Sequence, residues 1–173
     1  MRQTGTMSAS STMSTEIFGT DEQHLRQAIA ISKRAVAHGN HPFGALLVDG
    51  DGRIALEAEN TVNTQSDATG HAETNLVRLA TKSFDLEALR ASTLYTSCEP
   101  CAMCTGAIYW AGIGRIVYAL GEDGLLPLTG DHPDNPTLDL PCREVLARGQ
   151  RQVSVDGPAL SDEARVPHLG FWV

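Results

Sequence analysis

Two short stretches of the chain carry residue types that bind metal ions: His71-Ala72-Glu73 and Pro100-Cys101-Ala102-Met103-Cys104. Cys101 and Cys104 are three residues apart, so on one helix they share a face and can bind a single ion. Pro100 favours the first turn of a helix, where free N–H groups and the helix dipole stabilise thiolates. His71 supplies a third ligand, which leaves the fourth position of a tetrahedral Zn²⁺ open, as in catalytic sites. We therefore expect one zinc ion per subunit, bound by His71, Cys101 and Cys104.

Glu73 is the candidate acid/base. In mid-helix His71 and Glu73 point to different sides, but at a helix N-terminus both can lean toward the end of the axis. Gly70 allows the tight entry to such a helix. Glu73 can then take a proton from water at the open zinc position and pass it to a leaving group. The alternative is a zinc-stabilised binding module without catalysis, which would lack this carboxylate or close the site with a fourth protein ligand.

The remaining cysteines are interpreted as structural residues. Cys98 precedes the helix turn and is expected to be a packed residue at a strand end, and Cys142 has no partner pattern and is expected to be structural. A lone C-x-x-C also occurs in redox and structural zinc motifs. The combination of H-x-E opening one helix with P-C-x-x-C opening another favours a catalytic zinc.

The elements that must position these residues follow from apolar spacing. A helix is expected from Leu25 to Val36, ended by Gly39, and another over His71 to Thr81. A third is expected over Pro100 to Ala111, a short one over Cys142 to Arg148, and a last short one after Pro158. Strands are expected over Phe43 to Val48, Arg53 to Ala58, Thr93 to Thr96, Arg115 to Leu120 and Gln152 to Val155, the first two joined by Asp49-Gly50-Asp51-Gly52. Gly121 to Pro141 is expected to be mostly loop. This order predicts an α/β fold: a three-layer α-β-α sandwich with a mixed five-stranded sheet.

Length and composition limit the class of protein. The 173 residues, 42% of them hydrophobic, suit a single domain, expected over residues 16–173, after a disordered Ser/Thr-rich tail at residues 1–15. Thirteen Lys and Arg stand against 21 Asp and Glu, a net charge of −8 that disfavours nucleic acid as a partner. No apolar run reaches the roughly 20 residues that span a bilayer, so no membrane partner is expected. The N-terminus has no secretory pattern and only four cysteines occur, which favours the cytoplasm.

The pattern H-x-E…P-C-x-x-C is the signature of zinc-dependent nucleobase deaminases. From about Asp21 to Val155 the chain resembles the cytidine-deaminase-like superfamily. The stretches Leu94 to Cys101 and Gly106 to Ala111 look especially like bacterial guanine deaminase, and Pro42-Phe43-Gly44-Ala45 and Asn60-Thr61-Val62 also match that pattern.

The resemblance implies further site residues and a homodimer. Asn60 would hydrogen-bond the polar edge of a heterocycle and Phe43 would wall the pocket. A backbone N–H near Cys101 or Ala72 would orient the oxygen that becomes bonded to the ring carbon in the reaction. The implied reaction is hydrolytic deamination of a free amino-substituted nucleobase, first of all guanine to xanthine and ammonia.

Two departures from the guanine deaminases keep other substrates open. Asp67-Ala68-Thr69-Gly70 replaces their usual Asp-Pro-Thr-Ala, and the acidic, Phe-bearing segment after the fourth strand has no clear counterpart. Asp131 or Asp134 could substitute, or could be solvated turn residues. Cytosine, cytidine, another aminopurine, a pterin or a triazine would suit such a pocket. Adenosine in tRNA is less favoured, because Gly121 to Pro141 contains acidic residues and no Lys or Arg.

The aromatic residues on the zinc helix and at the C-terminus have two interpretations each. Trp110 is expected to be core or pocket floor. Phe171 and Trp172 would be unfavourable on a free end. Residues 156–173 could therefore pack on the core of this subunit or cap an active site, its own or a neighbour's.

Overall fold

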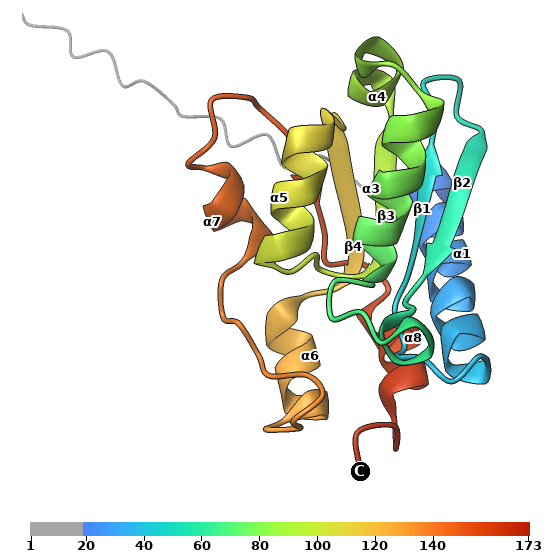
Figure 1. The fold of residues 1–173 in the computed structure, drawn as a ribbon, viewed down its shortest axis with the longest axis vertical. Helices are drawn as coiled ribbons and strands as arrows, with labels where there is room; N and C mark the ends of the chain where they lie inside the picture. The colour runs from blue at the N-terminus through green and yellow to red at the C-terminus, as the bar shows by residue number, and fades with distance from the viewer. Residues whose placement is uncertain (1–18) are drawn as a thin grey trace, which may run out of the picture.

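A five-stranded sheet with strand order β2-β1-β3-β4-β5 forms the centre of the molecule (Figure 1). It is seen in a computed structural model that describes residues 19–173. The strands are β1 (Gly44–Val48), β2 (Ile54–Glu59), β3 (Thr93–Cys98), β4 (Arg115–Leu120) and β5 (Ser154–Asp156). β1 pairs antiparallel with β2 and with β3, whereas β3 pairs parallel with β4 and β4 with β5. The prediction of a mixed five-stranded sheet is confirmed.

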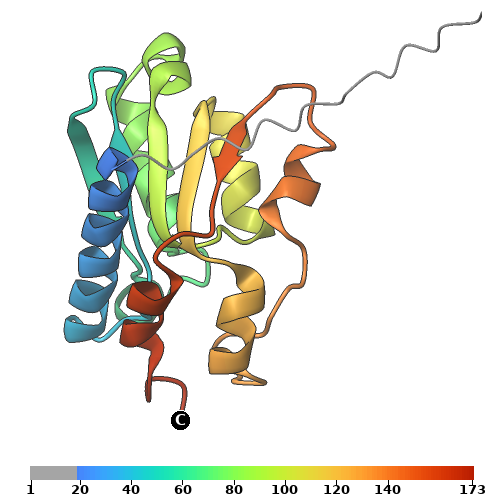
Figure 2. The same ribbon diagram turned by 180° about the vertical axis from the view of Figure 1, so that it is seen from behind.

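Helices cover both faces of this sheet, as Figures 1 and 2 show from opposite sides. One face carries α1 (Gly19–Ala37) and α8 (Ser161–Arg165), and the other carries α3 (Ala72–Ser83) and α5 (Ala102–Ala111). The remaining helices are α2 (Val62–Gln65), α4 (Leu86–Ala91), α6 (Glu122–Thr129), α7 (Cys142–Leu146) and the 3-10 turn η1 (Val166–His168). The three-layer α-β-α sandwich is confirmed.

The core lies in two layers, one on each side of the sheet. Alternating residues of β1 enter different layers, because successive strand side chains point to opposite faces. Ala45 and Leu47 join the cluster under α3 and α5, and Leu46 and Val48 join the cluster under α1. β1 is buried on both faces, which explains why its sequence is an uninterrupted apolar run.

Gly44 lets α1 approach β1 closely. A Cβ at this position would lie 2.5 Å from the carbonyl oxygen of Ala28 and from the amide nitrogen of Ser32 in α1. Any larger residue would push the helix away from the strand. Gly44 therefore determines how closely the helix layer that contains α1 packs on the sheet.

Gly121 to Pro141 is mostly loop, as expected, but its first part contains a helix that was not predicted, because α6 occupies Glu122–Thr129 despite Gly124 and Pro127. Burial of Leu125 and Thr129 stabilises the helix where local propensity does not. Residues 131–141 contain no helix or strand.

Smaller differences concern element boundaries. The short helices α2 and α4 were not predicted, although Asp85 caps α4 by accepting a hydrogen bond from the Ala88 amide at 2.9 Å. β3 runs on to Cys98, and α5 begins at Ala102, so Pro100 lies before the helix and not in its first turn.

The expected disordered tail at residues 1–15 lies outside the described residues. Within residues 19–173, none of the helices has the length and apolarity that a membrane span requires.

Candidate active site and metal centre

His71, Cys101 and Cys104 meet where two helices begin. His71 is the N-cap residue of α3, Cys101 is the N-cap residue of α5, and Cys104 lies in the first turn of α5. The side-chain ligand atoms of all three lie within 4.8 Å of one another. The sequence prediction of a shared metal site at two helix N-termini therefore agrees with the geometry.

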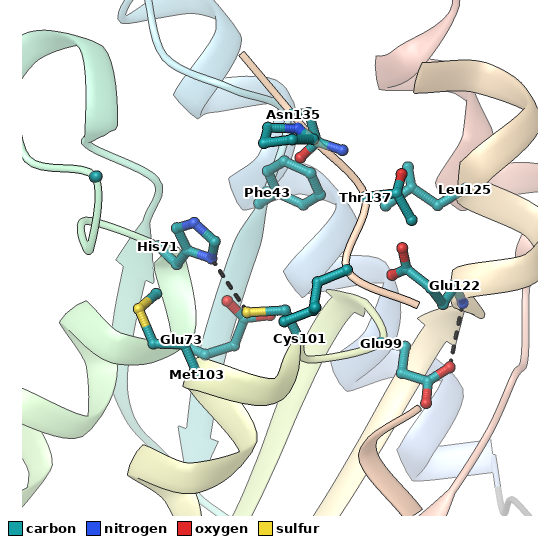
Figure 3. Close-up of a pocket in the computed structure, with 13 residues that line it drawn as sticks. Phe43, His71, Glu73, Glu99, Cys101, Met103, Glu122, Leu125, Asn135 and Thr137 are labelled. Atoms are coloured by element: carbon teal, nitrogen blue, oxygen red, sulfur yellow. Dashed lines mark hydrogen bonds between the residues drawn. The ribbon is translucent and has the colours of Figure 1, made fainter. Parts of the chain in front are cut away.

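The spacing of these atoms fits zinc. His71 Nδ1 lies 3.7 Å from Cys101 Sγ, a contact drawn in Figure 3, and 3.5 Å from Cys104 Sγ. Tetrahedral Zn²⁺ with bonds of about 2.3 Å to sulfur and about 2.0 Å to nitrogen would separate such atoms by about 3.5 Å. Two sulfurs and one imidazole are also the ligand types that zinc prefers. The three residues form a candidate zinc site with three protein ligands.

Of the three residues, only Cys101 is biased toward the protonation state that binds metal. A hydrogen bond from Cys104, assisted by His71, lowers the pKa of Cys101 to about 4. The same contact with Cys101, together with burial, raises the pKa of Cys104, and the hydrogen bond to Cys101 raises the pKa of His71. Zinc ligation needs both thiolates, so metal binding should release the Cys104 proton.

Glu73 lies directly beside the three ligands. Its side chain is only 4% exposed, and Oε2 lies 3.5 Å from Cys104 Sγ. Oε1 lies 2.9 Å from the hydroxyl oxygen of Thr96 on β3. Burial raises the pKa of Glu73. A buried carboxyl at this place can hold or release a proton next to the metal site.

A cavity of about 250 Å³ opens over this cluster (Figure 3). Its floor contains His71, Glu73 and Cys101, and its other walls come from separate parts of the chain: Phe43, Ala68, Glu99, Met103, Glu122, Leu125, Asn135, Pro136, Thr137 and Leu138. Mostly apolar walls around a few converging polar groups are typical of small-molecule sites. The volume suits a ligand of the size of one heterocycle.

The outer wall of this cavity is held by Glu99. Its Oε2 accepts a hydrogen bond from the Glu122 amide at 3.2 Å, and its Oε1 accepts one from the Cys142 amide at 2.9 Å. These amides lie at the starts of α6 and α7, where helix N–H groups have no partner inside the helix. Glu99 therefore closes the segment that carries residues 135–138 into a loop over the metal site.

The residues predicted to contact a ligand fall at different distances from the cavity. Phe43 lines it. Asn60 is buried outside the lining, and its Oδ1 accepts a hydrogen bond from the Val62 amide at 3.1 Å. Ala72 is the first residue of α3 and belongs to the core cluster under that helix. Roles for Asn60 and for the Ala72 amide stay predictions.

The expectation that Trp110 is core or pocket floor is wrong for this chain, since its side chain is 85% exposed. The face of α5 that packs on the core carries Cys104, Ile108 and Ala111. The indole of Trp110 lies on another side of the helix.

The C-terminal aromatics pack behind the cavity wall. Trp172 is 8% exposed, and its ring centroid lies 6.2 Å from that of Phe43 and 6.1 Å from that of His168. Phe171 packs edge-on against Trp172, with ring centroids 4.8 Å apart. Neither residue lines the cavity. Packing on this subunit's core is the arrangement observed, and a cap over a neighbour's site stays a prediction.

Other cysteines and acids lie away from the ligands. Cys98 and Cys142 are buried and are not members of the metal cluster, in agreement with the sequence interpretation. Asp131 and Asp134 are exposed, so the interpretation as solvated turn residues holds, and neither lines the cavity.

Sequence reasoning missed Glu99 and Glu122 as cavity residues. Glu99 directly precedes the zinc motif, which was a usable signal. Glu122 lies in the segment that was expected to be loop, and only the hydrogen bond from its amide to Glu99 places it at the cavity.

Comparisons with known proteins agree with this geometry. Residues 19–120 match the cytidine and deoxycytidylate deaminase zinc-binding region. The probable cytosine deaminase of Schizosaccharomyces pombe is 44% identical over 160 residues, which cover 92% of this chain and 96% of that protein. Guanine deaminase of Bacillus subtilis is 44% identical over 99 residues, which cover 57% of this chain and 63% of that protein. A solved guanine deaminase from Nitrosomonas europaea shares the fold, with a TM-score of 0.71 at 24% identity, over 89% of this chain and 85% of that one.

Proposed function

This chain belongs to the family of cytidine and deoxycytidylate deaminases with a zinc-binding region, and we propose that it hydrolytically removes the exocyclic amine of a free nucleobase, first of all cytosine. The observation that carries the proposal is the buried carboxyl of Glu73 beside the His71, Cys101 and Cys104 cluster, at the floor of a cavity sized for one heterocycle.

The roles of the residues follow from their positions. His71, Cys101 and Cys104 would hold the metal, and zinc, when bound, supplies an activated water near neutral pH. Glu73 takes a proton from the water as its oxygen bonds to the amine-bearing ring carbon, and gives it to the adjacent ring nitrogen. Glu73 then carries the proton of the newly bonded hydroxyl to the amine, the hydroxyl oxygen becomes a carbonyl as the carbon–nitrogen bond breaks, and ammonia leaves. Phe43 packs against the ring and excludes water.

Cytosine is the first candidate because the similarity to the probable cytosine deaminase extends over almost the whole chain. A match over 92% of the chain includes the segment from Glu122 to Leu138 that forms the outer wall of the cavity. The outer wall of the cavity therefore lies within the aligned region.

Guanine is the second candidate. It is supported by the motif residues Leu94 to Cys101 and Gly106 to Ala111, and by the 44% identity to a guanine deaminase over 57% of the chain. A cavity of about 250 Å³ has room for a purine as well as a pyrimidine.

An anionic tRNA is disfavoured as a substrate. The segment after β4 presents Glu122, Asp123, Asp131, Asp134 and Asp139 without any Lys or Arg, and a polyanion binds where cations cluster.

The experiment is a screen for ammonia release by the zinc-loaded protein. The panel contains cytosine, guanine, cytidine, adenine, isoguanine, a pterin, an aminotriazine and a tRNA. The proposal expects cytosine to give the largest kcat/KM. Release from guanine alone would transfer the assignment to guanine, and release from none of the free bases would contradict the proposed function.

Three further features belong to this proposal. Residues 16–173 act as a single deaminase domain. A homodimer would cover the exposed indole of Trp110, and Trp110→Lys should then lower the mass measured by light scattering. The cytoplasm is the compartment proposed, because four free thiols and a thiolate metal site suit reducing conditions.

A further inference from the structure

Glu122 is an acidic residue that lines the cavity and has no role in the reaction described above. It is the first residue of α6 and lines the same cavity as Glu73. Figure 3 shows its carboxyl directed into the cavity from the side opposite His71, whereas the carboxyl of Glu99 turns away from the cavity. The position of Glu122 thus faces the part of a bound ring that is remote from the metal ligands.

The backbone of Glu122 is held firmly. Its amide donates to Glu99 Oε2 at 3.2 Å, and the carbonyl oxygen of Gly121 accepts hydrogen bonds from the amides of Gly124 and Leu125 at 3.0 Å each. The helix start is therefore anchored to the loop that carries the zinc ligand Cys101. Such anchoring keeps the backbone of Glu122, from which the side chain extends, at a constant place relative to the metal site.

The carboxyl of Glu122 itself makes no hydrogen bond or ion pair with any of residues 19–173. Burial raises its pKa to about 7, and the negative groups around it add to the shift: Glu99, Cys101, Asp139 and Asp123. A half-buried, unpaired acid among other acids is unfavourable for the fold. Residues of this kind are typically retained for a ligand.

We propose that Glu122 is a specificity-determining residue whose carboxylate accepts a hydrogen bond from a ring N–H of a free base. This inference rests on the proposed function for the identity of the ligand. In a free pyrimidine or purine one ring nitrogen carries a hydrogen that a sugar replaces in nucleosides and nucleic acids. A carboxylate at the far end of the cavity accepts a hydrogen bond from this N–H, and a nucleoside has no hydrogen at that nitrogen to donate. Glu122 thus selects free bases over nucleosides.

The test compares Glu122→Gln with wild type at pH 8, where the carboxylate is ionised. The matched control is Asp123→Asn, which removes a charge at the neighbouring, exposed position. A hydrogen bond to a charged acceptor is worth about tenfold in binding. Glu122→Gln should therefore raise KM for the free base about tenfold and lower the preference for base over nucleoside, with kcat changed less than about threefold. Zinc content and the parameters of Asp123→Asn should stay at wild-type values.

An unchanged KM and an unchanged preference in Glu122→Gln would overturn the proposal, and so would a loss of kcat at constant KM. If wild type deaminates no free base, the proposed function fails by itself. Calorimetric titration of cytosine and guanine into wild type and Glu122→Gln then decides on Glu122: equal Kd values, or binding of neither base, overturn its role, and weaker binding to the variant supports it.

Discussion

The hydroxyl oxygen of Thr96 lies 2.9 Å from Oε1 of Glu73 and 3.0 Å from the carbonyl oxygen of Cys98. A hydroxyl has one proton and can donate to only one of these oxygens at a time. When Glu73 is ionised, Thr96 can donate to the carboxylate. When Glu73 is protonated, Thr96 can accept from it and donate to Cys98 instead. Thr96 therefore fits both protonation states that an acid/base residue must adopt.

Removal of this hydroxyl should slow the reaction without loss of the metal. Thr96→Val keeps the volume of the side chain in the buried strand β3 and deletes its hydrogen bond to Glu73. We expect kcat to fall about tenfold, since a hydrogen bond to a charged group is worth about 1.5 kcal/mol. Thr96→Ser, which retains the hydroxyl, should keep most of the activity. Equal kcat values for the two variants would argue against a role for this hydrogen bond.

The ligand set predicts which cysteines bind zinc. Cys104→Ser should lower the zinc content measured by elemental analysis to a small fraction of one ion per chain, because thiolate is replaced by a weak oxygen ligand. Cys142→Ser is the matched control, as Cys142 is also buried but lies outside the cluster. Loss of zinc in Cys142→Ser, or full zinc in Cys104→Ser, would contradict the assignment.

The residues of the metal site and those of the outer cavity wall illustrate what the sequence could and could not predict. His71, Glu73, Cys101 and Cys104 were predictable because helix N-termini, two short motifs and metal chemistry are local properties. The outer wall was not, because residues 122–138 are placed by the hydrogen bonds of Glu99 to the amides of Glu122 and Cys142. Trp110 was misplaced because an apolar residue on a buried helix can lie on any of its sides.

The elements of the fold were likewise predictable where their sequence pattern is local. Alternating and continuous apolar runs predicted the five strands and the four helices expected up to Arg148, and the predicted mixed sheet is the one observed. Helix α6 was missed because Gly124 and Pro127 weaken its local pattern, and burial of Leu125 stabilises it through contacts that are distant in sequence.

Glu122 should make stability depend on pH. Burial raises its pKa from the ordinary value of 4.5 to about 7, so the folded chain binds this proton more tightly than the unfolded chain. Its contribution to stability is therefore fully present below about pH 4.5 and is lost as the pH rises through about 7. The melting temperature of Glu122→Gln minus that of wild type should be larger at pH 8 than at pH 5. The same difference at both pH values would show that Glu122 does not titrate in this way.

The C-terminal Trp172 should contribute to stability more than to turnover. Its Nε1 donates to His168 Nδ1 at 3.2 Å, and His168 is 2% exposed, with a pKa that burial lowers to about 4. Trp172→Phe would leave this buried nitrogen without a donor at a cost of about 1–3 kcal/mol, which lowers Tm by several degrees. Leu169→Ala, at a position 64% exposed, is the control and should melt like wild type. Activity per bound zinc should stay within about twofold, and its loss at unchanged Tm would favour a cap over an active site instead.

The central claim is that Glu73 moves the protons of a hydrolytic deamination at the His71, Cys101 and Cys104 site. Its most direct test is the rate of ammonia release from cytosine and guanine by wild type and Glu73→Gln, both with measured zinc content. We predict full zinc in both proteins, turnover by wild type, and a loss of at least about a thousandfold in kcat/KM for Glu73→Gln. Turnover by Glu73→Gln close to that of wild type, at equal zinc content, would contradict the claim.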